Sequence, residues 1–349
     1  MNSKEKVRLV AFVSWRIYLE SRRKIKSQWK NSIVLPIFFG LGRWKSNKLF
    51  LRILRILIRE KKCIARGPMA AELALDSGFN KVCYDGRAAV SAEIEEFNVI
   101  GDDKLAISVI NAESRAVIES YFRISVSHSL VDYWVKKFGY TKSDHIIIPC
   151  TLTQGFQDSE KEKVEELRSQ IGISNKDIVF VFSGGNAGWN SLERTFSIFD
   201  QRLKNNPKYK MILLTGEAEY IKDYMNKFPD QVFRFWVNHE DVKNYLALGD
   251  YGLMIRENKV TNNVASPVKF AEYLSLGLKP IISDNIKDYS DFVSKHNCGL
   301  IITENSNVEF NSLTEADRMR NTELAKTYLY KNSDQIKKNY NLLKEKMSN

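Results

Sequence analysis

Short apolar runs alternate with longer amphipathic stretches through the first part of the chain. Six of the runs have the length and the polar or glycine endings of β-strands; they cover residues 7–15, 32–39, 61–67, 81–86, 122–127 and 145–150. The stretches between them are long enough for helices. This alternation of strands and helices predicts a parallel sheet in an α/β fold.

A polar and highly charged segment, residues 152–176, interrupts this alternation, and we expect a linker and a surface helix there. A second series of β-rich runs follows, covering residues 177–185, 210–216, 232–237, 251–256 and 278–283. After Leu313 the chain becomes helical and charged. The pattern predicts two α/β domains in tandem, residues 1–151 and 152–324, with a C-terminal helix at 325–349 that packs back on the first domain.

The composition agrees with two globular domains, because the 349 residues are 44% apolar and 27% charged. Four cysteines are widely separated, with no C-x-x-C or C-x-x-x-H spacing: Cys63, Cys83, Cys150 and Cys298. This usage indicates reduced thiols in a cytoplasmic protein and no structural zinc site. The longest uncharged apolar run near the start falls well short of a membrane span, and the charged opening MNSKEK leads into no secretory signal.

Charge is distributed unevenly along the chain. Residues 1–62 carry 17 Lys and Arg against three acids, a net charge of +14, whereas the whole chain is +11, so residues 63–349 sum to −3. Five of the cations recur at intervals of three, four, three and four: Lys45, Lys48, Arg52, Arg55 and Arg59. This spacing predicts one cationic stripe on a helix that either packs on a sheet with a cationic outer ridge or lies on an anionic membrane surface.

Residues 251–283 contain the most informative pattern for chemistry. Ser266 suits a helix N-cap, Pro267 suits the first helical position, and Gly277 suits the C-terminal end. If this helix follows a strand of a parallel sheet, its N-terminus lies at the carboxyl end of the sheet, where α/β folds bind ligands. Backbone amides and the helix dipole favour a phosphate at that position.

Two charged side chains of this helix share one face, because Lys269 and Glu272 are three residues apart. Lys269 would bring a positive charge to the phosphate, and Glu272 would accept hydrogen bonds from a ribose diol. Taken without its context, such a pair is also typical of an ordinary amphipathic surface helix. The wider sequence decides between the two interpretations.

Ten residues of the segment match one signature: Arg256, Asn262, Ser266, Pro267, Lys269, Phe270, Glu272, Tyr273, Leu274 and Gly277. The segment resembles the donor-binding signature of the retaining GT-B glycosyltransferases of the family 4 or group 1 class. More narrowly, it resembles members of bacterial surface-polysaccharide synthesis, with an Arg, an Asn six residues on, and then S-P-x-K-F-x-E-Y-L-x-x-G. Residues 180–196 are similar to the strand, glycine-rich turn and helix that open the nucleotide-binding domain, and residues 1–119 match only by fold pattern.

The resemblance implies a GT-B fold, in which two Rossmann-like domains face a central cleft, the first binding the acceptor and the second the nucleotide-sugar. It implies a retaining transferase that moves a sugar from a nucleotide-sugar, with UDP favoured, to a lipid-linked saccharide or glycan in cell-surface polysaccharide synthesis. The chain contains no D-x-D motif. We therefore expect no metal and no cofactor, with protein cations supplying the charge that Mg²⁺ supplies elsewhere.

The resemblance also implies roles for single residues. Arg256 and Lys269 would be the catalytic cations that neutralise the diphosphate, Glu272 would bind the ribose, and the backbone around Val237 would meet the base. The remaining donor-binding residues expected are Gly184, Gly185, Asn186, Asn262, Ser266, Pro267 and Val268.

This chain departs from the family at two places. Val264 stands where many members have a Glu that contacts the donor sugar. The Arg and Lys that often follow the glycine-rich turn are missing, and Asn186 and Asn190 stand nearby instead. Recognition of the donor sugar is therefore not inherited from the family pattern.

Acceptor-side residues are expected on loops of the first domain, with Arg16, Arg66 and Arg87 as anion-binding groups, Asp85 orienting an acceptor hydroxyl, and His128 near the cleft. A simple turn at Asp85 and a structural histidine at position 128 remain alternatives.

Three function classes follow from the whole pattern. The leading prediction is the glycosyltransferase, peripherally attached to the inner face of the cell membrane, with an anionic membrane surface and a lipid-linked glycan as partners. A nucleotide-sugar epimerase of GT-B fold would bind the same donor without an acceptor. A nucleic-acid-binding protein would use the basic N-terminal region, but no nucleic-acid-binding motif is present, so we expect no nucleic acid partner.

Overall fold

The computed structural model describes residues 7–37, 40–141, 144–153, 155–156, 158–304, 306 and 308–348. The chain forms two compact units, with unit 1 comprising Met1–Asp85 and Val99–Arg123, and unit 2 comprising Gly86–Asn98 and Ile124–Asn349. The predicted domain boundary after residue 151 stays a prediction. The charged opening, residues 1–6, and Phe38 and Phe39 at the end of a predicted strand lie outside the described residues.

Unit 1 contains strands of two different sheets, one two-stranded and one four-stranded. Strands β1 (Leu9–Val13) and β2 (Ser32–Pro36) pair in parallel in a two-stranded sheet of their own. Strands β3 (Lys62–Arg66) and β4 (Lys81–Gly86) also pair in parallel. The helices of this unit are α1 (Tyr18–Gln28), α2 (Lys48–Ile58), α3 (Pro68–Asp76) and α5 (Asp103–Glu119), and 3₁₀ turns cover Trp15–Ile17 and Leu41–Asn47.

Three cations of the predicted stripe have polar partners on α3, and the choice between an outer ridge and a membrane-facing stripe stays a prediction. Lys45 lies in the 3₁₀ segment before the helix, and its Nζ pairs with Glu72 of α3 at 2.9 Å. Lys48 pairs with Asp76 of α3 at 3.5 Å. Arg52 donates to the Asp76 carbonyl oxygen at 2.8 Å. The cationic edge of α2 thus meets acidic and carbonyl groups of α3, partners that lie far away in sequence.

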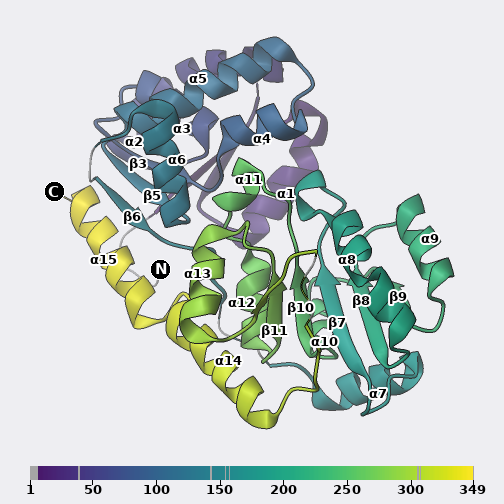
Figure 1. The fold of residues 1–349 in the computed structure, drawn as a ribbon. Helices are drawn as coiled ribbons and strands as arrows, with labels where there is room; N and C mark the ends of the chain where they lie inside the picture. The colour runs from purple at the N-terminus through teal and green to yellow at the C-terminus, as the bar shows by residue number, and fades with distance from the viewer. Residues whose placement is uncertain are drawn as a thin grey trace. The chain divides into compact units, whose positions relative to one another are not determined.

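In unit 2, six parallel strands form one sheet in the order β12-β11-β10-β7-β8-β9. Figure 1 labels all of them except β12. The strands are β7 (Ile178–Ser183), β8 (Tyr209–Leu214), β9 (Val232–Phe235), β10 (Tyr251–Met254), β11 (Lys279–Ile282) and β12 (Leu300–Ile301). Numbered along the chain, this is the order 3-2-1-4-5-6 of the doubly wound Rossmann fold. The order of strands reverses between β7 and β10, which are direct neighbours.

Helices cover both faces of this sheet. They are α7 (Lys161–Ile171), α8 (Leu192–Asn205), α9 (Glu219–Lys227), α10 (Val242–Leu246), α12 (Val268–Ser275), α13 (Lys287–His296) and α14 (Glu315–Tyr328). The short helix α11 (Val260–Asn263) contacts α4. Along β7, Phe180 and Phe182 pack into the core with α8 and α9, whereas Val179 and Val181 pack into the core with α12 and α13. This alternation of buried side chains on a strand covered on both faces is why the run reads as continuously apolar.

Unit 2 also includes α4 (Val90–Phe97), α6 (His128–Phe138), β6 (His145–Ile147) and α15 (Asp334–Ser348). Strand β5 (Phe122–Ser125) crosses the boundary of the two units. The C-terminal helix α15 packs against β6, and Asn339 Nδ2 donates to the Ile147 carbonyl oxygen at 2.7 Å.

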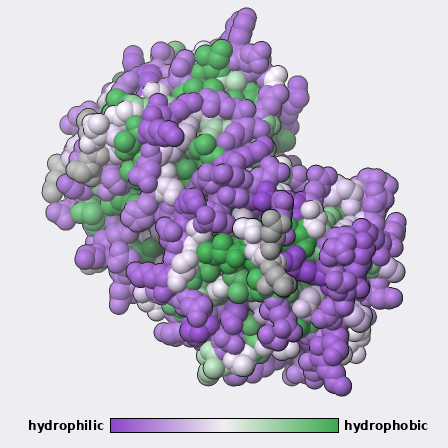
Figure 2. Space-filling view, in the orientation of Figure 1, coloured by the Kyte–Doolittle hydropathy of each residue, from purple (hydrophilic) through white to green (hydrophobic). Residues whose placement is uncertain are grey.

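All eleven predicted strand regions contain a strand, and the expected surface helix of the linker is α7. The short strand β12 was not predicted. Among the described helices, none combines the length and the apolar character needed to cross a membrane. On the face shown in Figure 2, hydrophilic residues predominate and hydrophobic residues are exposed between them.

Candidate functional site

The predicted donor-site residues lie in unit 2 on the loops that follow β7 and β10. Gly184 and Gly185 come directly after β7, and Arg256 comes two residues after β10. Because β7 and β10 are neighbours where the strand order reverses, their carboxyl ends flank the point at which doubly wound sheets bind ligands. The fold therefore brings the two predicted motifs together, although more than seventy positions separate them in sequence.

The start of helix α12 differs in detail from the prediction. Pro267, and not Ser266, is the N-cap residue, and no side chain caps the helix. The Ser266 hydroxyl instead accepts a hydrogen bond from the Cys150 backbone N–H at 3.0 Å and pairs with the Tyr289 hydroxyl at 2.9 Å. These tertiary partners leave the first-turn amides of α12 without a side-chain cap, as at a helix N-terminus that is free to bind an anion.

Asn190, which was not among the predicted site residues, links the two cations of the site to the glycine turn. The Asn190 side-chain oxygen accepts from Arg256 Nη2 at 3.4 Å and from Lys269 Nζ at 3.3 Å. Its amide nitrogen donates to the Gly185 carbonyl oxygen at 2.8 Å. Asn190 thus holds both cations beside the glycine turn. The only indication in the sequence was the position of Asn190 at the end of the glycine turn. No sequence pattern indicated that it contacts Arg256 and Lys269, which lie much further along the chain.

Burial weakens the hold of both cations on their protons. Arg256 is buried, and the loss of solvent lowers its pKa to about 10. Burial also lowers the pKa of Lys269 to about 8, and the neighbouring Arg256 charge acts in the same direction. Among the described residues, neither cation has a carboxylate within ion-pairing distance, and Arg256 Nε has no hydrogen-bond partner. A buried guanidinium and a half-buried ammonium side by side, neither of them in an ion pair with a described residue, favour the binding of an anion.

Glu272 lies on α12 one turn beyond Lys269 and is 9% exposed. Burial raises the pKa of this carboxyl, while the nearby Lys269 and His239 act to lower it. A buried carboxyl beside the cations, with its oxygens available as acceptors, has the chemistry to bind a pair of hydroxyl groups.

Helix α12 is held against β10 by a glycine and a tyrosine. A Cβ on Gly252 would lie 2.2 Å from the Tyr273 ring, so only glycine leaves room for this fully buried side chain. The Tyr273 hydroxyl accepts from the Ser183 N–H at 3.2 Å and donates to the Leu253 carbonyl oxygen at 3.3 Å. The same side chain therefore connects the ends of β7 and β10 with the helix that carries Lys269.

The other predicted donor residues have varied environments. Gly184 was expected to bind the donor, but its amide donates to the Leu214 carbonyl oxygen at 3.0 Å and is therefore engaged in the sheet. The Asn186 side chain bonds to Thr215 at 2.8 Å and to the Glu217 carbonyl oxygen at 3.1 Å, which ties the glycine turn to the segment after β8. Asn262 accepts from Arg256 Nη1 at 3.3 Å and supports that guanidinium.

Three valines lie at positions that the sequence analysis related to donor binding. Val237 lies two residues after the end of β9 and is half-buried, and Val268 is exposed in the first turn of α12. Val264, which replaces the sugar-contacting Glu of the family pattern, is buried and accepts a hydrogen bond from Ser127 at 2.6 Å through its carbonyl oxygen.

The acceptor-side residues divide between the units: Arg16, Arg66 and Asp85 belong to unit 1, and Arg87 and His128 belong to unit 2. Asp85 is buried in β4, whereas Arg16 and Arg66 are exposed. The backbone N–H of His128 donates to the Asp288 carboxylate at 2.7 Å at the start of α6, and its side chain is exposed. The acceptor roles of all five stay predictions. No three His, Cys, Asp or Glu side chains gather as a metal site in the part of the chain that the structure describes.

No family model matches the chain, and no curated protein matches its sequence. Solved structures do match its fold. HepE of Anabaena, solved in complex with UDP and glucose, matches with a TM-score of 0.65 at 12% identity, over 98% of this chain and 100% of that one. WaaG, described as a glycosyltransferase of lipopolysaccharide biosynthesis, matches with a TM-score of 0.62 at 13% identity, over 97% and 100%. Sucrose-phosphate synthase of Thermosynechococcus elongatus matches with a TM-score of 0.69 at 9% identity, over 98% and 99%.

These matches run over nearly the whole length of both chains in each pair. Together with the parallel sheets, they show that this chain has the GT-B fold of glycosyltransferases, built from two Rossmann-like domains. The predicted fold class is confirmed.

Proposed function

We propose that this chain is a glycosyltransferase that takes a sugar from a nucleotide-sugar. The observation that carries the proposal is a pair of cations, buried Arg256 and half-buried Lys269, which share the Asn190 oxygen beside the glycine turn after β7. Departure of a nucleoside diphosphate creates negative charge, and fixed cations in a buried site stabilise that charge strongly. The proposal needs no metal, since these two side chains supply the positive charge.

UDP is the nucleotide that we propose, because HepE, a solved structure of the same fold, was obtained with UDP and with UDP-glucose. Glu272 binds the ribose diol, and the backbone around Val237 meets the base. The first-turn amides of α12 add to the phosphate contact that Arg256 and Lys269 make. Transfer proceeds with retention of configuration at the sugar, as in the family that residues 251–283 resemble.

The acceptor in this proposal is a lipid-linked glycan of bacterial cell-surface polysaccharide synthesis. WaaG, which shares the fold, is described as acting in lipopolysaccharide biosynthesis. The net charge of +14 on residues 1–62 supports peripheral attachment at the inner face of the cell membrane, because anionic lipids attract such a segment.

A thermal-shift series in the presence of EDTA tests the donor site. UDP, GDP, ADP and CDP are compared on the wild-type chain, and a ligand at a hundred times its dissociation constant should add about 2.7 kcal/mol to the free energy of unfolding. We expect a selective shift with UDP. Glu272→Ala should remain folded and lose that shift, whereas Glu323→Ala, at an exposed glutamate of α14, should keep it.

Two results would contradict the proposal. One is the absence of a shift with every nucleotide. The other is a Glu272→Ala variant that binds UDP as tightly as the wild type does. Conversion of a UDP-sugar to its epimer without any acceptor would point instead to an epimerase that uses the same donor site.

A further inference from the structure

Helix α2 has two apolar faces, and only one of them is covered by unit 1. Leu51 is buried in a cluster with Trp44, Leu73 and Ala112. On the other face, four large apolar side chains are 49% to 74% exposed: Leu49, Ile53, Ile56 and Leu57, which we call the apolar stripe. Their spacing of four, three and one places them on one side of the helix.

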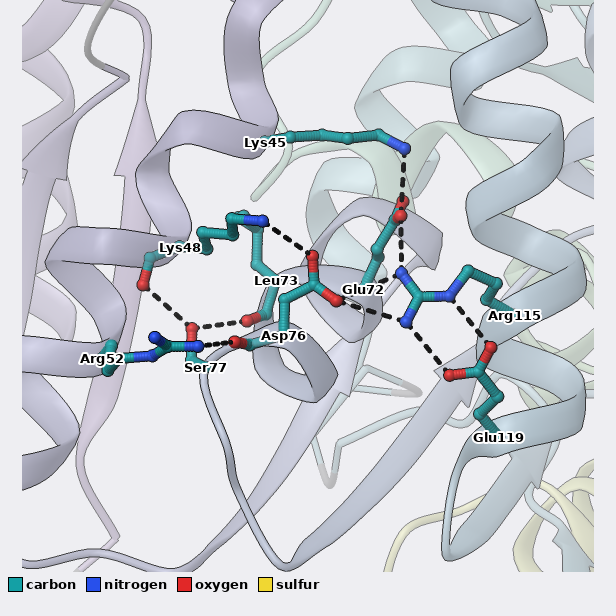
Figure 3. A network of polar contacts seen from close by, with 9 residues as sticks. All are labelled: Lys45, Lys48, Arg52, Glu72, Leu73, Asp76, Ser77, Arg115 and Glu119. Atoms are coloured by element: carbon teal, nitrogen blue, oxygen red, sulfur yellow. Dashed lines mark hydrogen bonds and ion pairs between the residues drawn. The ribbon is translucent and has the colours of Figure 1, made fainter.

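Polar contacts of α2 and of the turn before it with α3 fix the rotation of the helix (Figure 3). Glu72 and Asp76 lie one turn apart on α3 and pair with Lys45 and Lys48. Arg52 adds a hydrogen bond to the Asp76 carbonyl oxygen. Because the cationic edge of α2 is fixed against α3, the helix cannot turn its apolar stripe inward without breaking these contacts.

The carboxylates that hold α2 are themselves anchored. Arg115 of α5 donates to Glu72 at 2.8 Å and to Asp76 at 3.2 Å, and it also pairs with Glu119. Ser77 donates to the Lys48 carbonyl oxygen at 3.1 Å (Figure 3). The exposure of the stripe is therefore built into the packing of three helices and is not a frayed helix end.

We propose that the apolar stripe of α2 inserts into the boundary between headgroups and acyl chains of an anionic lipid bilayer. Helix α2 contains no acidic residue, and its exposed Arg52, together with Arg59 at its C-terminal end, borders the stripe. An interfacial helix places apolar side chains in the lipid and cations at the phosphate layer. With 11 residues, α2 has the length to lie in the interface and not to span the bilayer.

Charge favours lipid over a second copy of this chain as the occupant. A symmetric dimer through the stripe would bring two segments of net charge +14 together, which like-charge repulsion opposes. An anionic bilayer supplies the opposite charge. The assignment rests on the proposed function in one respect, since a lipid-linked acceptor requires the enzyme to reach a membrane.

Vesicle sedimentation of the full chain tests the assignment. One set of vesicles contains equal amounts of phosphatidylcholine and phosphatidylglycerol, and the other contains phosphatidylcholine alone. The stripe variant combines Ile53→Ser, Ile56→Ser and Leu57→Ser. The matched control variant combines Ile107→Ser, Val135→Ser and Met319→Ser, three exposed apolar residues on other helices.

We expect the wild type and the control variant to sediment with the anionic vesicles, and the stripe variant to lose about tenfold or more of its partitioning. Unchanged sedimentation of the stripe variant, or no binding by the wild type, would overturn the assignment. So would a wild-type dimer by light scattering that the stripe variant converts to a monomer.

The UDP thermal shift is measured on the same proteins and separates the two proposals. We expect the stripe variant to keep the wild-type shift, since α2 belongs to unit 1 and the donor residues belong to unit 2. Loss of vesicle binding in the stripe variant, with no nucleotide shift in any protein, would support the membrane surface and contradict the donor site.

Discussion

The ammonium group of Lys269 occupies the space that a side chain at Gly184 would fill: a Cβ built on Gly184 would lie 2.2 Å from Lys269 Nζ. The φ angle of Gly184 is not positive, so its backbone would accept other residues. Glycine is required there for space and not for conformation. The missing side chain at Gly184 therefore leaves the space in which the Lys269 ammonium group lies.

Gly184→Ala should displace Lys269 and weaken UDP binding while leaving the fold intact. The atoms that the new methyl group meets first are the end of a flexible side chain, which moves at little cost to stability. Loss of a charge-assisted contact to phosphate should lower affinity by about tenfold to a hundredfold. Isothermal titration calorimetry with UDP measures the change, and thermal melting checks that the variant folds.

A double-mutant cycle gives this prediction its control. If Gly184→Ala acts by moving Lys269, it should have almost no further effect on affinity in a Lys269→Ala background. Equal losses in both backgrounds would mean that the methyl group obstructs the ligand directly and that the lysine is not what the glycine positions.

The fold was predictable from the sequence because its signals are local. Apolar runs of strand length, separated by amphipathic stretches, marked every strand of the central sheets except the two-residue β12. The closeness of Lys269 and Glu272 was predictable for the same reason, since helical periodicity places them on one face.

The features that could not be predicted from the sequence are contacts between residues far apart in the chain. Ser266 has the chemistry of an N-cap, but its hydroxyl is taken up by Tyr289 and the Cys150 amide. The spacing of Lys45 and Lys48 placed them on one stripe, but it did not show that they pair with Glu72 and Asp76 of another helix. Periodicity describes one element and carries no information about which neighbour meets which face.

The lowered pKa of Lys269 predicts opposite effects of pH on ligand affinity and on stability. Diphosphate binding requires the ammonium form, so UDP affinity should fall as pH rises through about 8, by up to about tenfold per pH unit. Between about pH 8 and the ordinary lysine pKa of 10.5, Lys269 binds fewer protons in the folded than in the unfolded chain. Its contribution to the free energy of unfolding therefore rises with pH over that window.

Lys269→Arg is the control for this pH dependence, because a guanidinium keeps its charge throughout the range. Calorimetric UDP titrations between about pH 7 and about pH 9 should give a flatter profile for the variant than for the wild type. Parallel profiles for the two proteins would assign the titration to another group.

Gly252→Ala should destabilise unit 2. The new Cβ would lie 2.2 Å from the fully buried Tyr273 ring, which has no open space into which to move. Overpacking of this kind costs about 1–3 kcal/mol or more. Urea denaturation measures the loss. The matched control is Gly185→Ala, where no atom lies within 4 Å of the added Cβ and φ is not positive, and its stability should equal that of the wild type.

Asn190→Asp should make the free protein more stable and a weaker binder of UDP. A carboxylate at this position would lie within hydrogen-bond distance of both Arg256 and Lys269, which have no carboxylate partner among the described residues. It would offset the cost of burying the two cations, raise the pKa of Lys269 above its value of about 8, and thereby raise the melting temperature. The same negative charge would repel the diphosphate from the site.

Asn190→Ala separates the charge effect from the loss of the amide. This variant removes the acceptor shared by the cations and the donor to the Gly185 carbonyl oxygen, so both stability and UDP affinity should fall. The aspartate should therefore move the two quantities in opposite directions, and the alanine should move them together. If both variants lowered stability and affinity alike, Asn190 would act only as a packing residue of the turn. If the aspartate raises stability and lowers UDP affinity, the two cations lack a negatively charged partner in the free protein. An anionic ligand would then supply that partner and stabilise the protein.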